Sequence, residues 1–354
     1  MVARLFACAQ LRERFAVSSD TVAAMPTAFV TGANGFVGVT LVEQLVDAGW
    51  DVTAMHRPTS DISDLERFPV TRVIATLEDT AALGEAMPQG VDVVFHVAGD
   101  VSHWSGHRQR QTRTNVDGTR NVVNAALAGG AGRLVYTSSI ASYGEVSGEV
   151  TEETPSTALG GGVNYGRTKW LAEVEVRKGI DRGLDAVIIQ PGSIFGRYDR
   201  HSWGRLITMV SSGTLPGVPG VTIDFCHGGA VARAHITAAQ SGATGEAYLV
   251  GGTRATFIEA AQLVAEQTGG KVPRKPTPMW QLRALGAASD LGSRVTKKEP
   301  DVTPELVRQL SYSAWADVTK AVDQLDYEVV PLPVMVEEAV DWMRSEGLIP
   351  ASPS

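Results

Sequence analysis

A glycine-rich turn between an expected strand and an expected helix constrains the fold of this chain more than any other stretch. Residues 31–38 read TGANGFVG and follow an apolar run at 28–30, and apolar residues then recur at helical spacing over 36–46. Gly32 can adopt the positive φ of a tight turn, and Gly38 lets the helix pack closely against the strand. A strand, a glycine turn and a helix in this order predict a binding site for the phosphates of a nucleotide.

The backbone of this turn supplies the candidate phosphate contacts. Gly35 allows N–H groups to approach a pyrophosphate, and the helix N-terminus adds partial positive charge. The candidate cofactor-binding residues of the turn are Gly32, Asn34, Gly35, Phe36, Val37 and Gly38. The spacing is Gly-x-x-Gly-x-x-Gly rather than the commoner Gly-x-Gly-x-x-Gly, and such turns also occur simply to join a strand to a helix. The turn alone therefore leaves both interpretations open.

Strand and helix patterns alternate along the first half of the chain. Strands are expected at 51–57, 72–75, 91–98, 133–139, 185–190 and 245–250, and helices at 79–87, 114–127 and 165–173. The strand at 91–98 is almost continuously apolar, as expected for a parallel strand covered on both faces. The alternation predicts an α/β fold with a doubly wound parallel (Rossmann) sheet.

The regular alternation weakens after Pro191. Helices are expected at 257–268, 304–310 and 334–344, which predicts a smaller, mostly helical C-terminal lobe that binds the substrate. We therefore divide the chain into a dinucleotide-binding domain and this lobe. The predicted ranges are 26–190 for the first, with strands around 222–250 returning to it, and 191–221 with 251–350 for the second. Residues 1–25 precede the pattern and are expected to be disordered, as a transit peptide or, preferably, an over-extended start before Met25.

Composition excludes some partners. The 354 residues carry a net charge of −8 without a basic stripe, which argues against nucleic-acid binding. No run of about 18 apolar residues is present, so no membrane span and no membrane partner are expected. The two cysteines, Cys8 and Cys226, lie far apart without metal-ligand spacing. Their scarcity indicates a reducing compartment, which we take as cytoplasmic, and no metal site is expected.

The end of the second expected strand bears on the choice of cofactor. An acid about 20 residues after the glycines usually binds the ribose hydroxyls of NAD. Asp51 has roughly that separation, but it begins the strand instead of ending it. Arg57 stands at the strand's end, and a guanidinium there suits a 2′-phosphate by charge and by bidentate hydrogen bonding. We therefore expect NADP(H) to be preferred and NAD(H) to be possible, although Arg57 could also be a solvated surface residue.

A tyrosine and a lysine share one face of the helix expected at 165–173. Tyr165 is the only one of seven tyrosines with a lysine, Lys169, four residues on. A neighbouring ammonium and a nicotinamide cation would lower the phenol pKa and allow proton exchange with a carbonyl oxygen. Ser138 and Ser139 end an expected strand at the edge where ligands bind, and one of them could hydrogen-bond the reacting oxygen.

Polar and aromatic residues near the expected pocket complete the candidates. His103 and Trp104 follow the strand at 91–98 and could line the pocket, although Trp104 could equally pack against a helix. Phe195 and Trp203 also lie near the expected pocket and favour a partly apolar or aromatic substrate. Asn164 could cap the helix that carries Tyr165.

Several motifs taken together resemble one family. The chain resembles an extended short-chain dehydrogenase/reductase, the superfamily of nucleotide-sugar epimerases, 3β-hydroxysteroid dehydrogenases and dihydroflavonol reductases. The resemblance covers residue 26 to about 346, and its motifs come in family order at 31–38, 96–99, 115–119, 136–139, 165–169 and 191–196.

The resemblance assigns roles to individual residues. It implies Tyr165 as the catalytic acid/base, Lys169 as the residue that holds the nicotinamide ribose and lowers the tyrosine pKa, and Ser139 as the serine of the site. Asn115 would support the proton relay. It further implies cofactor contacts, beside those of the turn, at Leu77, Ala98, Gly99, Thr137, Pro191, Gly192 and Ser193, and it suggests a possible homodimer.

Departures from the family pattern narrow the substrate. Where nucleotide-sugar members carry an arginine before Asp-Phe and acids after His-Val, this chain has Ile223 and Gly228–Gly229. A sugar diphosphate would need that arginine. We therefore expect an NADP(H)-dependent oxidoreductase for a carbonyl or secondary alcohol of a small, partly apolar substrate, on the dihydroflavonol-reductase and hydroxysteroid-dehydrogenase-like branch. An NAD-dependent sugar or nucleotide-sugar epimerase or dehydratase is the alternative, and a non-catalytic dinucleotide sensor is the weakest.

Overall fold

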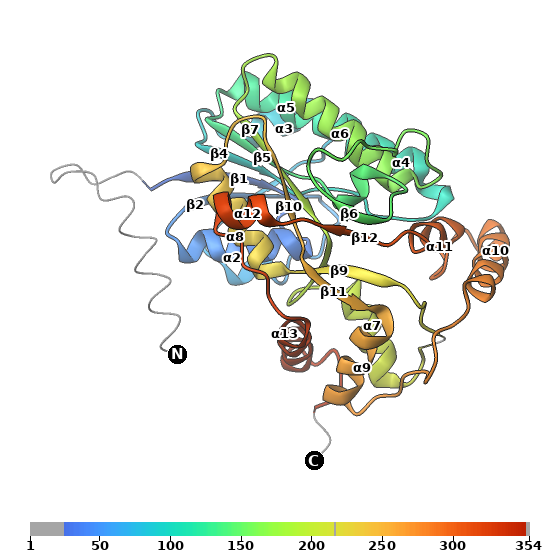
Figure 1. Ribbon diagram of the computed structural model, residues 1–354. Helices are drawn as coiled ribbons and strands as arrows, with labels where there is room; N and C mark the ends of the chain where they lie inside the picture. The colour runs from blue at the N-terminus through green and yellow to red at the C-terminus, as the bar shows by residue number, and fades with distance from the viewer. Residues whose placement is uncertain (1–24, 216, 352–354) are drawn as a thin grey trace.

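Seven parallel strands form the main sheet of the protein. A computed structural model describes residues 25–215 and 217–351, apart from the side chains of residues 294 and 295. The strands of the main sheet are β1 (Thr27–Thr31), β2 (Asp51–His56), β3 (Thr71–Ile74), β4 (Val93–His96), β5 (Arg133–Thr137), β7 (Ala186–Pro191) and β10 (Ala247–Val250). Their order is β10-β7-β5-β4-β1-β2-β3, and every pairing is parallel (Figure 1). The predicted doubly wound parallel sheet is confirmed.

Helices cover both faces of this sheet. One face is covered by α3 (Thr80–Ala86), α5 (Gly118–Gly129) and α6 (Asn164–Ile180), and the other by α2 (Phe36–Asp47), α8 (Gly228–Ser241) and α12 (Thr319–Leu325) (Figure 1). Because both faces are covered, β4, β7 and β10 contain only buried residues. The strand order reverses between β1 and β4, and ligands of such sheets bind beyond the carboxyl ends of the strands at this point.

The remaining elements form the second lobe and the segments that connect it to the sheet. β11 (Thr253–Thr256), β9 (Thr222–His227) and β8 (Ser193–Phe195) form a three-stranded sheet, and β12 (Ala314–Ala316) pairs with β6 (Gly148–Val150). The helices are α4 (Arg108–Thr112), α7 (Trp203–Ser212), α9 (Phe257–Thr268), α10 (Met279–Thr296), α11 (Pro304–Gln309) and α13 (Leu332–Ser345). Short helical turns lie at η1 (Leu65–Arg67), η2 (Ser105–His107), η3 (Arg113–Asp117) and η4 (Ile140–Tyr143).

The region around 222–250 differs from the expectation that its strands return to the main sheet. Only β10 does so, whereas β9 pairs with β8 and β11. The chain between them forms α8, which packs against α2 and the main sheet. The expected helices at 257–268, 304–310 and 334–344 correspond to α9, α11 and α13. The boundaries of the two domains remain a prediction.

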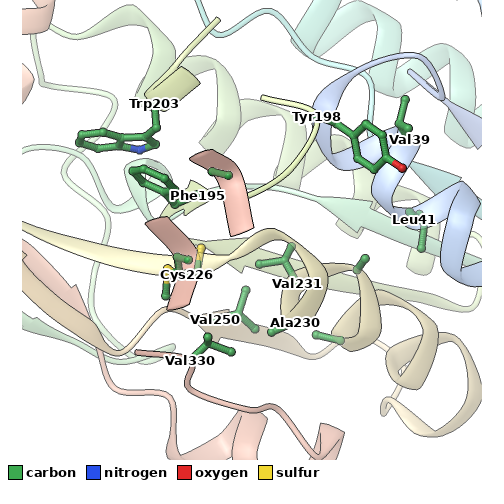
Figure 2. Packing of buried hydrophobic residues seen from close by; sticks show 14 of the residues in the cluster. Val39, Leu41, Phe195, Tyr198, Trp203, Cys226, Ala230, Val231, Val250 and Val330 are labelled. Carbon is green, nitrogen blue, oxygen red and sulfur yellow. The ribbon is translucent and has the colours of Figure 1, made fainter. Parts of the chain in front are cut away.

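Two aromatic residues expected beside the pocket lie in the hydrophobic core instead. Phe195 is fully buried and Trp203 nearly so, and their rings stack with centroids 5.5 Å apart (Figure 2). The Trp203 ring also lies 4.9 Å from that of Phe225. The expectation that Phe195 and Trp203 line a substrate pocket is therefore wrong, because β8, β9 and α7 pack these side chains against one another.

Residues 1–24, including Cys8, lie outside the described residues. The expected disorder of this N-terminal extension therefore stays a prediction. Cys226 is fully buried, and burial raises the pKa of its thiol well above the ordinary value, which fits an inert cysteine. Within 25–215 and 217–351, no helix combines the length and apolar character needed to cross a bilayer.

Candidate active site

The glycine turn after β1 is closely packed against the backbone around it. Gly32 has φ +67°, and a Cβ built on it would lie 2.7 Å from Ala98 Cα. A Cβ on Gly38 would lie 2.1 Å from the carbonyl oxygen of Gly32, so α2 starts in direct contact with the turn. The Gly35 N–H donates to the Gly32 carbonyl at 3.0 Å and closes the loop. A side chain at Gly32 or Gly38 would force this backbone apart.

The start of α2 fits the phosphates of a dinucleotide. The N-cap residue is Gly35, which has no side chain to accept hydrogen bonds from the first helical N–H groups, and the first turn carries no acid. The N–H groups of Phe36, Val37 and Gly38 therefore remain available to an anion, beside the positive end of the helix dipole. The Asn34 side chain donates to the Asp61 carbonyl at 3.2 Å and thereby connects the turn to the loop after β2.

The end of β2 carries exposed positive charge. Arg57 directly follows β2 and is exposed, and no ion pair or hydrogen bond of its guanidinium is found within the described ranges. Asp51 is the first residue of β2, at the end of the strand away from the glycine turn. No acid therefore follows β2 directly, where an NAD ribose would need one.

Leu77 is placed differently from the turn residues. Its side chain is buried against α5, where a Cβ on Gly118 would lie 2.9 Å from it, and its carbonyl accepts from Asn121 Nδ2 at 2.8 Å. An adenine contact by Leu77 stays a prediction that this packing does not itself support.

Tyr165, Ser139 and Lys169 meet at the carboxyl edge of the sheet. Tyr165 lies half-buried in the first turn of α6, close enough to Ser139, which follows β5, for the serine hydroxyl to lower the pKa of the phenol. The Ser139 hydroxyl donates to the Pro191 carbonyl at 3.5 Å. Lys169, one turn further along α6, is buried, and its Nζ donates to the Thr137 carbonyl at 2.8 Å. A Cβ on Gly99 would lie 3.3 Å from this ammonium, so the loop after β4 contacts Lys169 closely.

Burial dominates the ionisation of this pair. Burial raises the pKa of the Tyr165 phenol, and the nearby Ser139 hydroxyl partly opposes the rise. Burial lowers the pKa of Lys169 to about 8, and the nearby Glu173 carboxylate opposes that change. The lowered tyrosine pKa predicted from the sequence therefore requires additional positive charge beside the phenol, which a bound oxidised nicotinamide would provide.

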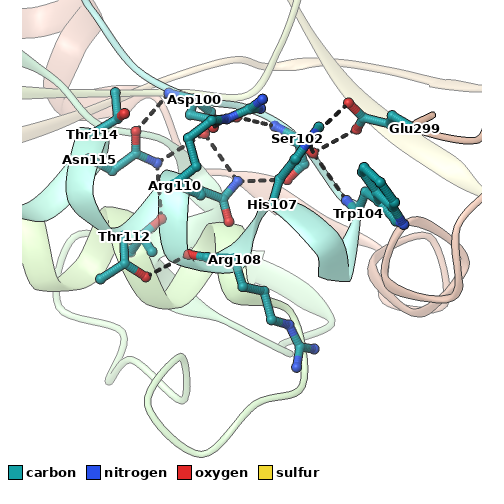
Figure 3. A network of polar contacts seen from close by, with 12 residues as sticks. Asp100, Ser102, Trp104, His107, Arg108, Arg110, Thr112, Thr114, Asn115 and Glu299 are labelled. Atoms are coloured by element: carbon teal, nitrogen blue, oxygen red, sulfur yellow. Dashed lines mark hydrogen bonds and ion pairs between the residues drawn. The ribbon is translucent and has the colours of Figure 1, made fainter. Parts of the chain in front are cut away.

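Asn115 fixes the loop that follows β4. It lies in the π-helical turn η3 and is buried. Its Oδ1 accepts from the Asp100 N–H at 2.7 Å, and its Nδ2 donates to the Asp100 carbonyl at 2.9 Å (Figure 3) and to Thr168 Oγ1 at 3.0 Å. Asn115 thus connects the loop beside Gly99 to the helix that carries Tyr165 and Lys169.

The other predicted cofactor residues surround the same edge. The Ala98 N–H donates to Thr31 Oγ1 at 3.3 Å, which ties the end of β4 to that of β1. The Thr137 hydroxyl is hydrogen-bonded to His235 at 2.7 Å, so only its carbonyl faces Lys169. Beyond β7, which ends at Pro191, Gly192 packs against Asp224, and Ser193 Oγ accepts from Trp203 Nε1 at 3.0 Å.

Ser138 belongs to a polar cluster that the sequence analysis did not identify. Its hydroxyl donates to the buried carboxylate of Glu173 at 2.5 Å, and Gln190 donates to the same oxygen at 2.9 Å. Glu173 lies one helical turn beyond Lys169, so its charge opposes the desolvation of the ammonium. The spacing Tyr165, Lys169, Glu173 on one helical face was the signal that could have revealed it.

The expected cap of α6 is wrong. The helix begins at Asn164, whose side chain donates to Gln111 Oε1 at 2.7 Å instead of capping it. The Asn164 N–H is bound at 3.2 Å by the carboxylate of Glu305 from α11. A residue distant in sequence thus replaces the local cap, and the same carboxylate forms an ion pair with Arg108.

The loop after β4 joins the second lobe to the site. The His103 ring lies 5.6 Å from the Tyr165 ring, and its Nε2 is hydrogen-bonded to Gln309 of α11 at 2.7 Å. Trp104 Nε1 donates to Ser293 of α10 at 3.1 Å, so Trp104 packs against a helix, as one of its two interpretations expected. His103 is therefore the loop side chain that the structure brings to Tyr165.

The ionisation of Lys169 gives a testable dependence of stability on pH. Between pH of about 8 and 10.5 the unfolded chain keeps the Lys169 proton while the folded protein releases it, so this residue favours folding increasingly as pH rises. Relative to Lys169→Met, the free energy of unfolding of the wild type should rise by on the order of 2 kcal/mol from pH 7 to pH 10. Urea unfolding of both proteins at the two pH values measures this, and parallel changes would contradict the assignment.

The fold and this site together define a class of enzyme. A glycine turn at the switch point of a Rossmann sheet, with Tyr165, Ser139 and Lys169 at the same edge, is the arrangement expected of a dinucleotide-dependent oxidoreductase. Residues 28–251 match the model of the NAD dependent epimerase/dehydratase family. The chain belongs to this family, and it is an NAD(P)-dependent oxidoreductase of the extended short-chain dehydrogenase/reductase type.

Individual relatives align along nearly the whole chain. A putative dihydroflavonol 4-reductase of Synechocystis is 29% identical, with 91% of this chain and 95% of the relative covered. Sterol demethylase protein B of Methylococcus capsulatus is 31% identical, with 91% and 100% covered. The crystal structure of gox2253 superposes with a TM-score of 0.79 at 30% identity, with 92% and 99% covered.

Proposed function

We propose that this protein is an NADP(H)-dependent reductase or dehydrogenase that acts on a carbonyl or secondary alcohol of a small, partly apolar substrate. The observation that carries the proposal is that Tyr165, Ser139 and the buried Lys169 lie together at the carboxyl edge of the sheet. The names of the two relatives, one a putative dihydroflavonol reductase and the other a sterol demethylase protein, support a partly apolar substrate.

The chain's own residues handle the proton in this reaction. A bound nicotinamide supplies or accepts the hydride at the substrate carbon. In the reducing direction Tyr165 donates its phenolic proton to the carbonyl oxygen, and Ser139 hydrogen-bonds that oxygen as its charge develops. The Lys169 ammonium stabilises the resulting phenolate, and Asn115 keeps the loop at Gly99 in place. In the oxidising direction the same residues carry the proton the opposite way.

The surroundings of Asp224 argue against a sugar diphosphate as the substrate. Its buried carboxylate accepts hydrogen bonds from the N–H groups of Gly252 at 2.8 Å and Ala316 at 3.1 Å. It therefore holds these two backbone segments of the lobe together. Ile223 precedes it, where nucleotide-sugar enzymes would carry an arginine. A sugar diphosphate would lack that cationic partner here.

The preference for NADPH depends on Arg57 and can be tested directly. Arg57→Ala should weaken NADPH binding by roughly 10–100-fold, because it removes charge-assisted hydrogen bonds to the 2′-phosphate. NADH binding should change little. Titrations of both proteins with both cofactors, followed by tryptophan fluorescence, measure the difference, and Arg72→Ala on β3 is a matched control with another exposed arginine. Tight NADH binding that is insensitive to Arg57 would favour the epimerase alternative.

Cofactor stoichiometry tests the proposed reaction itself. Incubation of the enzyme with NADPH and a panel of apolar ketones, including steroid and flavonoid ketones, should oxidise one NADPH for each alcohol formed. A product formed from a sugar without net consumption of added cofactor would instead establish an epimerase. Binding of NADPH without turnover of any ketone or sugar would favour a sensor.

A further inference from the structure

Helix α10 lies at the edge of the second lobe, beside α11 (Figure 1). Leu282 and Ser293 are buried, and Gly286 contacts the backbone of Thr303, where a Cβ would lie 3.3 Å away. Ser293 also binds Trp104 of the loop after β4. This packed side of α10 faces α11 and the loop that carries His103.

The opposite side of α10 is apolar and exposed. Its stripe consists of five residues at helical spacing, none of them polar: Trp280, Ala284, Ala287, Ala288 and Leu291. Trp280 is 68% exposed and Leu291 is 65% exposed, and these are the two most exposed large apolar side chains of the described residues. Nothing in the rest of the described chain covers this stripe, which is unusual for a tryptophan and a leucine on one helical face.

The flanks of α10 are strongly basic. Residues 271–298 carry a net charge of +6, from seven basic residues and the single acid Asp290, in a chain whose total charge is −8. Six of the basic side chains belong to described residues and are exposed without an ion pair there: Lys271, Arg274, Lys275, Arg283, Lys297 and Lys298. Positive charge and exposed apolar surface therefore occur together in one segment.

This combination fits an anionic lipid surface. A helix with Trp and Leu on one face and Lys and Arg around it lies in the plane of a membrane interface, with the apolar side chains inserted and the cations at the headgroups. The described helices include none that could cross a bilayer, so contact would be superficial. The expectation of no membrane partner rested on the lack of a membrane-spanning run, and a surface of this kind needs no such run to bind lipid.

We propose that α10 docks the protein on an anionic lipid bilayer, with Trp280 and Leu291 inserted among the lipids. The packed side of α10 would then hold the loop of His103 near the membrane, and the His103 ring lies 5.6 Å from Tyr165. Lipid docking stands independently of the proposed reaction, because its test measures binding and not turnover.

Sedimentation with vesicles tests the docking. The full-length protein should bind mixed phosphatidylcholine/phosphatidylglycerol vesicles at least about tenfold more strongly than pure phosphatidylcholine vesicles, and high salt should weaken the binding. Trp280→Ala/Leu291→Ala should reduce it by about tenfold without changing the charge or the melting temperature. Val322→Ala on α12, 42% exposed, is the matched control and should bind as the wild type.

A second readout follows Trp280 itself. Brominated lipids in the mixed vesicles should quench part of the tryptophan fluorescence, and Trp280→Phe should remove that part. Equal binding of the wild type and the double alanine variant would overturn the proposal, as would absence of binding to mixed vesicles. A lipid-free dimer that the double variant dissociates would also overturn it, because the stripe would then be covered by a second copy.

Discussion

Tyr165→Phe should lower turnover by roughly 10²–10⁴-fold, the range that positioned proton transfer contributes in enzymes. The substitution removes only the hydroxyl near Ser139, and it leaves the ring beside His103 in place. Folding and NADPH affinity should therefore change little. Steady-state NADPH oxidation with the best ketone of the panel measures the loss, and a fluorescence titration shows that the cofactor still binds.

A second tyrosine provides the control for this result. Tyr312 is also half-buried, and its hydroxyl donates to Glu145 at 3.0 Å, outside the Tyr165 set. Tyr312→Phe should leave turnover close to the wild-type value, whereas Ser139→Ala should lower it. Wild-type turnover in Tyr165→Phe would exclude this phenol as the proton donor. Cofactor binding with no effect of Tyr165→Phe on any activity would move the interpretation toward a sensor.

Local patterns accounted for most of the sheet and for the glycine turn. The bounds of β1, α2 and β2 follow from short-range signals, namely an apolar run, glycines and helical spacing. Strands buried on both faces are recognisable because their sequences are almost uniformly apolar. Conversely, β8 and β9 form a small sheet whose pairing depends on contacts between distant segments, and their sequences do not indicate which sheet they join.

The sequence predicted which residues form the candidate site, but not the hydrogen-bond partners of each side chain. Ser138 and Ser139 both follow β5, and only the three-dimensional arrangement directs the first hydroxyl to Glu173 and leaves the second beside Tyr165, where it donates to the Pro191 carbonyl. Asn164 was expected to cap α6 because local rules favour asparagine there. The carboxylate of Glu305, 141 residues away, occupies that role instead. Tertiary contacts of this kind leave no signal in the local sequence.

At the glycine turn, Gly38→Ala should lower both the free energy of unfolding and the affinity for NADPH. The added methyl group would lie 2.1 Å from the Gly32 carbonyl oxygen and 2.9 Å from Ala33 Cα. Both neighbours are backbone atoms, so relief requires moving α2 away from the turn. Overpacking of this kind costs about 1–3 kcal/mol, and displaced N–H groups should weaken NADPH binding by roughly tenfold or more.

Gly84→Ala distinguishes this steric effect from glycine replacement in general. Gly84 lies in α3, and a Cβ there would meet no atom within 4 Å. Alanine at such a helical position should raise the free energy of unfolding by about 0.4–1 kcal/mol and leave the cofactor affinity unchanged. Urea unfolding and NADPH titration of both variants measure the contrast. Gly38→Ala could also lose stability and still bind NADPH as tightly as the wild type. The turn would then have only a structural role, and the phosphates would have to bind elsewhere on the sheet edge.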